Sequence, residues 1–129
     1  MKLMAIAVAM VIALPATAEV VKRSDGFTAN CDNPTTREDG TLLPVLEIKQ
    51  VQYFVDPVYG NVANPDLTVL MTGGCNPTFI DTKQLAVGTY YRYAITEDTS
   101  GLLSVVSVQS ISDPLVLQNA NPNAPGNVK

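Results

Sequence analysis

The side chains that could take part in acid–base chemistry form two adjacent pairs, Glu38-Asp39 and Glu97-Asp98. Each pair lies in a predicted turn, where Asp and Gly are common because of the backbone conformations that turns need. The chain has no His, which removes the most frequent general base and the imidazole of a catalytic triad. It also lacks a nucleophile elbow. We therefore expect no catalytic residue and no enzyme activity, with a small hydrolase as the least supported class of function.

Ligands for a metal ion or a cofactor are also scarce. The two cysteines, Cys31 and Cys75, cannot complete a four-ligand zinc site. The turn carboxylates lack the Asp-x-Asp-x-Asp spacing of calcium loops, and there is no Gly-rich phosphate loop. A net charge of −4 argues against nucleic acid as a partner, since its binding depends on clustered Lys and Arg. The sequence predicts no metal, no cofactor and no nucleic-acid partner.

Residues 1–18 have the pattern of a secretory signal. Lys2 precedes an apolar run over residues 3–14, and Ala16 and Ala18 fit the small residues of a cleavage site. The alternative is a membrane anchor, but the run is too short, because a membrane span needs roughly 20 residues. We predict cleavage after Ala18, no membrane span in the mature chain, and a secreted or periplasmic protein.

Export also bears on the two cysteines. Oxidising compartments favour disulfides, so we predict that Cys31 and Cys75 form a bridge. A pair of free, buried thiols is the alternative.

The mature chain contains short segments rich in Val, Ile, Tyr and Thr that are bounded by turn residues. Alternation over residues 48–55 places Val51, Tyr53 and Val55 on one face, which we expect to face the core. About seven strands at short spacing are typical of an antiparallel β-sandwich. The predicted strands are residues 19–23, 27–31, 48–55, 67–71, 75–80, 90–97 and 102–111, with a short extension at 115–117. The domain would span residues 19–117, and residues 118–129, rich in Asn and Pro, are expected to be disordered.

Four stretches resemble fibronectin type III domains of bacterial exported proteins, and one of them, residues 46–55, resembles the family's third strand. Residues 27–41 resemble the family's second strand with its Pro-Thr-Thr loop and acidic–Gly turn. Residues 85–91, Leu-Ala-Val-Gly-Thr-Tyr-Tyr, resemble its Leu-x-Pro-Gly-Thr-x-Tyr corner, and residues 94–104 its strand–turn–strand. The likeness covers residues 20–114, with Val87 in place of Pro and Cys31 in place of the core Trp. It implies an all-β, seven-stranded antiparallel immunoglobulin-like sandwich.

The resemblance also implies roles for single residues. Leu85, Gly88 and Tyr91 would form a structural corner in which the Tyr91 hydroxyl returns to the backbone near Leu85. The second and fifth strands would be antiparallel neighbours, which brings Cys31 and Cys75 within reach of each other.

Two side chains of the strand after the corner are candidates for a binding surface. Tyr93 and Ile95 would share the face of Tyr91 and belong to the core, so Tyr90 and Arg92 would point outward. Tyr and Arg are frequent in interface hot spots. An ordinary solvated strand face is the alternative.

These features predict an exported, non-enzymatic binding or structural module that presents loops on a rigid β-sandwich. Its long loops are residues 32–41 and 56–66, and its partner is an unknown protein or carbohydrate at the cell envelope. The alternative is a subunit of a cell-surface fibre or matrix that assembles through strand edges, for which residues 102–111 and 115–117 are the candidates.

Overall fold

A computed structural model describes residues 18–107 and 114–128 of the chain. The predicted signal therefore lies outside the described residues, apart from Ala18. Within them the protein is all-β, with one turn of 3-10 helix, η1 (Val45–Glu47), and no helix long and apolar enough to cross a membrane. The seven strands are β1 (Glu19–Lys22), β2 (Phe27–Ala29), β3 (Ile48–Asp56), β4 (Leu67–Thr72), β5 (Thr78–Ile80), β6 (Gly88–Asp98) and β7 (Leu115–Gln118).

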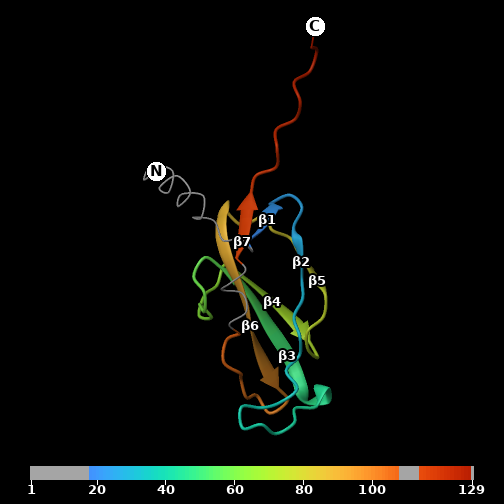
Figure 1. Cartoon of the computed structure of the whole chain (residues 1–129), viewed down its shortest axis with the longest axis vertical. Coiled ribbons are helices and arrows are strands. Elements are labelled where there is room, and N and C mark those ends of the chain that lie inside the picture. The colour runs from blue at the N-terminus through green and yellow to red at the C-terminus, as the bar shows by residue number, and fades with distance from the viewer. Residues whose placement is uncertain (1–17, 108–113, 129) are drawn as a thin grey trace, which may run out of the picture.

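The strands form two sheets (Figure 1). The larger sheet has the order β1-β7-β6-β3-β4, and the smaller one pairs β2 with β5. The long strand β3 is antiparallel to both of its neighbours, so that Tyr53 lies opposite Val69 of β4 and Ala94 of β6. β2 and β5 are antiparallel, as predicted for the second and fifth strands. β5 begins only at Thr78 because Pro77 before it has no amide hydrogen to give to a ladder.

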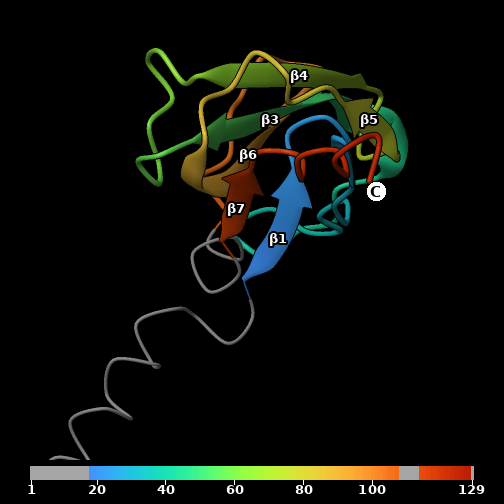
Figure 2. The ribbon, with the colours of Figure 1, turned by 90° about the horizontal axis from the view of Figure 1, so that it is seen from above.

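The prediction that all strands are antiparallel is wrong at one place. β1 lies beside β7 and runs parallel to it, with Glu19 opposite Leu115, as Figure 2 shows. Two bonds extend this pairing, from the Glu19 amide to the Pro114 carbonyl and from the Arg23 amide to the Gln118 carbonyl. The chain then turns at Gly26 and enters the smaller sheet, so the first strand belongs to the larger sheet and β2 to the smaller one.

The single long strand predicted over residues 102–111 is also not observed. Residues 104–107 lie beside β6, but the Ser104 amide bonds to the Thr96 carbonyl while the Ser107 amide bonds to the Ala94 carbonyl. One extra residue thus stands opposite β6, which breaks the regular ladder as a bulge does. Residues 108–113 of that prediction lie outside the described residues. The predicted extension at 115–117 is β7, which lies between β1 and β6.

The main core takes side chains from both sheets. Phe27 and Ala29 of β2 and Ile80 of β5 contribute from the smaller sheet. The larger sheet contributes Val51, Tyr53, Val55, Met71, Tyr90, Leu115 and Leu117, which confirms the predicted core face of β3. Phe54, Tyr93 and Ile95 form a second cluster, against which Tyr59, Tyr91 and Val106 pack. Both faces of the central strands β3 and β6 therefore carry buried apolar side chains.

After β7 the chain leaves the domain as an extended arm, residues 119–128, which is exposed and contains neither helix nor strand (Figure 1). The loops that join β2 to β3 and that follow β6 lie at the opposite end of the molecule. The fold thus has two distinct ends, one with the arm and one with these loops.

Candidate functional site

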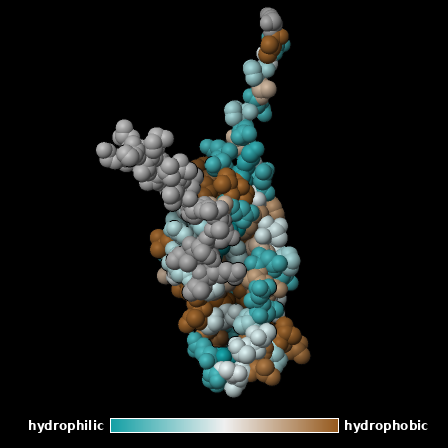
Figure 3. Space-filling view, in the orientation of Figure 1, coloured by the Kyte–Doolittle hydropathy of each residue, from teal (hydrophilic) through white to brown (hydrophobic). Residues whose placement is uncertain are grey.

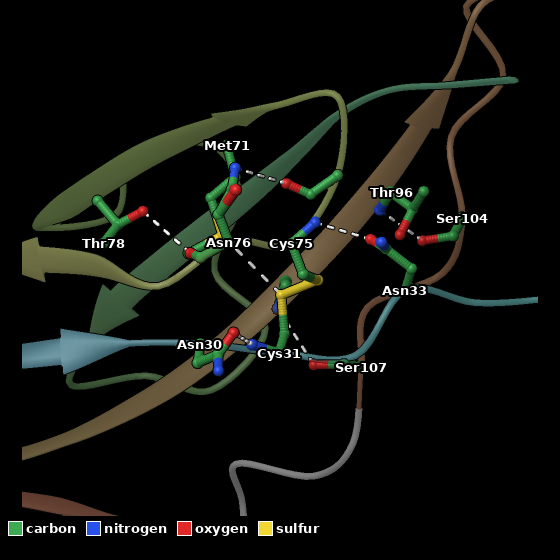
Figure 4. Close-up of a disulfide and its surroundings, with 12 residues drawn as sticks. Asn30, Cys31, Asn33, Met71, Cys75, Asn76, Thr78, Thr96, Ser104 and Ser107 are labelled. Atoms are coloured by element: carbon green, nitrogen blue, oxygen red, sulfur yellow. Dashed lines mark hydrogen bonds between the residues drawn. A yellow bond between two sulfur atoms is a disulfide. The ribbon is translucent and has the colours of Figure 1, made fainter. Parts of the chain in front are cut away.

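Cys31 and Cys75 form the predicted disulfide (Figure 4). Their Cα atoms are 5.4 Å apart, and the bridge lies just beyond the paired ends of β2 and β5. The Cys31 sulfur is 3.9 Å from the sulfur of Met71, which is buried. The bridge therefore joins the smaller sheet to the margin of the main core.

The loops on either side of the bridge are held together by Asn33. Its side-chain oxygen accepts a hydrogen bond from the Cys75 amide at 2.7 Å. A Cβ atom at Gly74 would lie only 2.7 Å from that same oxygen, and the backbone there has a φ of +130°. Gly74 thus allows a close approach that a larger residue would prevent.

At the corner predicted from Leu85, Gly88 and Tyr91, the tyrosine that bonds back to the backbone is Tyr90. The Tyr90 hydroxyl donates to the Ala86 carbonyl at 2.7 Å, and burial raises its pKa. Tyr90 pairs with Leu115, which is fully buried, and directly opposed residues of neighbouring strands share a face. Tyr90 therefore points into the main core, and Tyr91 points to the second cluster. The prediction was one residue out of phase.

The same shift removes the predicted binding surface of Tyr90 and Arg92. Tyr90 is 3% exposed, and the side chain of Arg92 is 13% exposed. The Arg92 guanidinium pairs with the Glu19 carboxylate at 2.7 Å and lies 5.5 Å from the centre of the Phe27 ring. Arg92 thus links β6 to β1 and to the smaller sheet. This role could not be predicted from the sequence, because it depends on β1 lying in the larger sheet.

The acid pair Glu97-Asp98 organises the end of β6. Asp98 is buried, and one of its oxygens accepts a hydrogen bond from Arg37 at 2.8 Å. Its other oxygen accepts the amides of Ser100 and Leu102, each at 2.9 Å. The hydrogen bond from Arg37 lowers the pKa of Asp98. Arg37 also bonds to Glu47 at 3.0 Å and so joins two loops.

The acid pair Glu38-Asp39 has a similar place in the neighbouring loop. An oxygen of Asp39 accepts both the amide and the hydroxyl of Thr41, and these bonds lower its pKa. The two turns have related sequences, Glu-Asp-Gly-Thr-Leu-Leu at residues 38–43 and Glu-Asp-Thr-Ser-Gly-Leu-Leu at 97–103. In each, an acid pair and a glycine precede two leucines. This recurrence in the sequence identifies the two turns as related.

The two turns enclose a groove of about 390 Å³, which we call the loop groove. Its lining residues are Pro34, Thr36, Arg37, Glu38, Asp39, Leu43, Thr96, Asp98, Leu102, Leu103 and Ser104. Leucines of both turns are exposed here, with Leu42 at 77% and Leu102 at 64%, and Leu46 of η1 nearby is 89% exposed. Figure 3 shows hydrophobic atoms beside hydrophilic ones at this end of the molecule. Of these three leucines, Leu102 lines the groove, whereas Leu42 and Leu46 lie outside its lining.

The other long loop, residues 56–66, is closed on itself. Asp56 is buried, and its oxygens accept hydrogen bonds from the amides of Val58 and Asp66 and from the side chain of Asn61. The Tyr93 hydroxyl donates to the Asn61 carbonyl at 2.5 Å. Burial raises the pKa of Tyr93 to about 12. Over the described residues, no group of three His, Cys, Asp or Glu side chains could hold a metal ion.

No family model, curated protein or solved structure matches the chain.

Proposed function

We propose that the protein is an exported, non-enzymatic binding module that holds its partner in the loop groove. We further propose that its two sheets form an immunoglobulin-like sandwich of the fibronectin type III kind. Three features support this fold: the strand order, the pairing of β2 with β5, and a core that contains side chains from both sheets. The disulfide and the apolar run at residues 3–14 support export.

The observation that carries the function is the exposure of leucines around the loop groove. Contiguous apolar surface is rare on a soluble monomer and marks interaction sites. Burying such surface is favourable by about 25 cal/mol per Å². The groove's walls are held by the ion pairs of Arg37 with Asp98 and Glu47, so the site is largely formed before a partner arrives.

The chemistry of the groove favours a protein over a carbohydrate as partner. Sugar hydroxyls need polar groups with free hydrogen-bonding capacity, whereas Asp98 and Arg37 already bond to each other and to their surroundings. Leu102 and Leu103, which are 64% and 59% exposed, instead offer apolar contacts. A peptide segment with small or medium apolar side chains fits this surface.

The test compares two lysine substitutions at leucines of equal exposure. Leu103 in the groove is 59% exposed and Leu70 on β4 is 58% exposed. The wild-type protein and both variants would be cross-linked to envelope proteins and compared by quantitative mass spectrometry. We expect Leu103→Lys to lose partners that the wild-type protein and Leu70→Lys retain. Equal recovery with all three proteins, or recovery of nothing above background, would refute binding through the groove.

The second candidate function is a subunit of a surface fibre that assembles by strand addition. Since β7 is flanked on both sides, the edges of the larger sheet are β1 and β4. β4 favours this alternative because it is long and exposes Leu70 along an edge. A lysine at Leu70 would hinder strand addition, so loss of partners in Leu70→Lys alone would support the fibre.

A further inference from the structure

β4 is an edge strand that carries no charge. It lies at the end of the larger sheet, and among the described strands it pairs only with β3. Edge strands that stay unpaired are protected by charged side chains, Pro or bulges, because their backbone groups are open to another strand. The sequence of β4, Leu-Thr-Val-Leu-Met-Thr, has no charge and no Pro, and its register with β3 has no shift. The free edge of β4 is therefore suited to pairing with a further strand.

The register of β4 determines which of its backbone groups face outward. The Gly73 amide, just after β4, donates to the Lys49 carbonyl, so these two residues form a hydrogen-bonded pair. In an antiparallel ladder such pairs alternate with pairs whose backbone groups point away from each other. Counting back along β4 from Gly73, the residues that point their N–H and C=O groups away from β3 are Thr72, Leu70 and Thr68. We call these three the edge residues.

The backbone groups of the edge residues have no partner within the described chain. They take part in none of the backbone hydrogen bonds of the described turns and loops, and β4 has no strand on this side. The three side chains are exposed, and Leu70 is 58% exposed. Figure 2 shows β4 at the outer margin of the molecule. The edge residues thus present a strip of alternating donors and acceptors to solvent.

We propose that β4 pairs with β4 of a second copy, antiparallel and about a two-fold axis at Leu70. Leu70 then lies opposite its own counterpart, and Thr68 lies opposite Thr72 of the other copy. Facing residues exchange both of their N–H and C=O groups, so three facing pairs with two bonds each give six hydrogen bonds. Every outward backbone group of both strands is then bonded. Moving the axis by one residue would leave an edge residue of each copy facing a residue beyond β4.

The side chains agree with this register. Thr68 meets Thr72, and Thr–Thr pairs stabilise antiparallel strands. Leu70 meets Leu70, which removes exposed apolar surface from water. On the core side, Val69 meets Met71. No like charges face each other, because β4 has no charged residue.

Such a contact closes with two copies. Because each copy uses the same edge, neither β4 stays free, whereas a fibre needs two different surfaces on each copy. The loop groove contains Asp98, which lies at the same end of the larger sheet as Thr72. Since the two β4 strands run in opposite directions, the dimer carries one groove at each end. The pairing goes beyond the proposed function, which it does not require, and would allow one dimer to hold two partners.

The first experiment measures self-association of the purified exported protein by sedimentation velocity. It compares the wild-type protein with Leu70→Lys and Val20→Lys, at positions 58% and 59% exposed on the two edge strands of the larger sheet. Two six-residue strands make a small interface, so high protein concentrations are needed. We expect dimers and nothing larger from the wild-type protein and Val20→Lys. Leu70→Lys should stay monomeric, because two lysines would face each other.

The second experiment tests the position of the two-fold axis. Leu70→Glu should be monomeric by itself, like Leu70→Lys, but a mixture of the two variants should form one-to-one dimers. Opposite charges then face each other at the axis. Melting temperatures within a few degrees of the wild-type value would show that the variants are folded, as expected for an exposed position. A mixture that stays monomeric would overturn the proposal.

The third experiment measures amide hydrogen exchange of the wild-type protein at low and high concentration. The amides of Thr68, Leu70 and Thr72 should become protected only where dimers form. Those of Val69 and Met71 point toward β3 and should be protected at both concentrations. Dimers in which the edge residues stay unprotected would place the contact elsewhere and overturn the proposal.

Three further outcomes would overturn it. A wild-type protein that stays monomeric at high concentration has no such contact, and if Leu103→Lys still loses an envelope partner, the proposed function survives alone. Dimers that persist in Leu70→Lys, or that are lost in Val20→Lys, do not form through β4 alone. Wild-type species larger than a dimer indicate a fibre.

Discussion

Asp98 is the residue on which the loop end of the molecule depends. Its carboxylate accepts hydrogen bonds from the guanidinium of Arg37 and from the backbone amides of Ser100 and Leu102. The bond from Arg37 crosses from the loop after β2 to the end of β6. A single buried carboxylate thus shapes one turn and fixes its distance from the other, and both turns line the groove.

The lowered pKa of Asp98 makes the stability of this region depend on pH. The pKa of the Asp98 carboxyl is lower in the folded state than its usual value of 3.8. Such a group stabilises the folded state fully when the pH is above the usual, unfolded-state pKa. The contribution is lost as the pH falls through the lower, folded-state pKa. We expect Asp98→Asn to melt at a lower temperature than the wild-type protein at pH 7. The two melting temperatures should converge as the pH falls below about 4, because protonated Asp resembles Asn.

Melting curves recorded by circular dichroism from pH 7 to pH 2 would check this. Asp32→Asn, which removes the same charge at an exposed position, is the matched control and should keep a constant offset from the wild-type protein. A constant offset for Asp98→Asn as well would contradict the role assigned to Asp98.

The disulfide should contribute a large share of the stability. Cys31 and Cys75 are 44 residues apart, and closing a loop of this size stabilises a fold by about 4 kcal/mol in the chain-entropy treatment. A small domain has only about 5–15 kcal/mol in total. We expect Cys31→Ala combined with Cys75→Ala to lower the melting temperature by more than about 10 °C.

Thiol labelling of the denatured, unreduced protein should find no free sulfhydryl. Two labelled thiols per chain, or an unchanged melting temperature in the double variant, would show that the bridge does not form or does not stabilise the fold.

Two neighbouring tyrosines near the start of β6, Tyr90 and Tyr91, should differ in what their hydroxyls contribute to stability. Tyr90→Phe removes the hydrogen bond to the Ala86 carbonyl and should cost about 0.5–1.5 kcal/mol. Tyr91→Phe changes a hydroxyl on the opposite face of the strand and should cost less than about 0.5 kcal/mol. Urea denaturation of the two variants measures both values. The reverse order would restore the phase of the corner that the sequence predicts.

The irregular segment beside β6 contains two serines, Ser104 and Ser107, whose alanine variants can be compared. The Ser107 hydroxyl accepts the amide of Ala94 in a partly buried place, and the Ser104 hydroxyl accepts that of Thr96 in an exposed one. Ser107→Ala leaves a shielded amide without a partner and should cost about 1–3 kcal/mol. At Thr96 water can replace the hydroxyl, so Ser104→Ala should cost less.

Hydrogen exchange of the two amides gives a direct measurement. The Ala94 amide should exchange faster in Ser107→Ala, while the Thr96 amide, already near solvent, should change little in Ser104→Ala. Equal effects in the two variants would argue against this difference in burial.

The strands that were predicted correctly from the sequence are those whose local pattern agrees with their packing. Alternation in β3 identified Val51, Tyr53 and Val55 because one face of that strand lies in the main core. The prediction was wrong where a neighbouring strand determines which face of a strand is buried. Tyr90 faces inward because Leu115 lies opposite, and Leu115 belongs to a segment that looked like a short extension.

The site was missed for a related reason. Residues 102–107 are as apolar as a strand, but the extra residue between the bonds of Ser104 and Ser107 interrupts their ladder with β6. Leu102 and Leu103, which precede this bulge, line the groove. A pattern of hydrophobic residues does not reveal an extra residue in a pairing register. The disulfide was predicted because it needs only a compartment and two cysteines.

At the scale of the whole molecule, the proposed export predicts the N-terminus and the mass of the mature chain. Cleavage after Ala18 would leave Glu19, the first residue of β1, as the new N-terminus. We expect intact-mass measurement of the exported protein to give a chain of residues 19–129 with two hydrogens fewer than its sequence requires, because of the disulfide. A chain that keeps residues 1–18, or one with the full hydrogen count, would contradict export or bridge formation respectively.

The parallel pairing of β1 with β7 has a consequence for the folding rate. These strands come from opposite ends of the described chain, so their contact closes a very long loop. Proteins rich in such distant contacts fold slowly. If the chain crosses the membrane with its N-terminal end first, Val20 and Val21 of β1 cannot pair until β7 has emerged. The strand that enters the new compartment first is then among the last to take its place in the sheet.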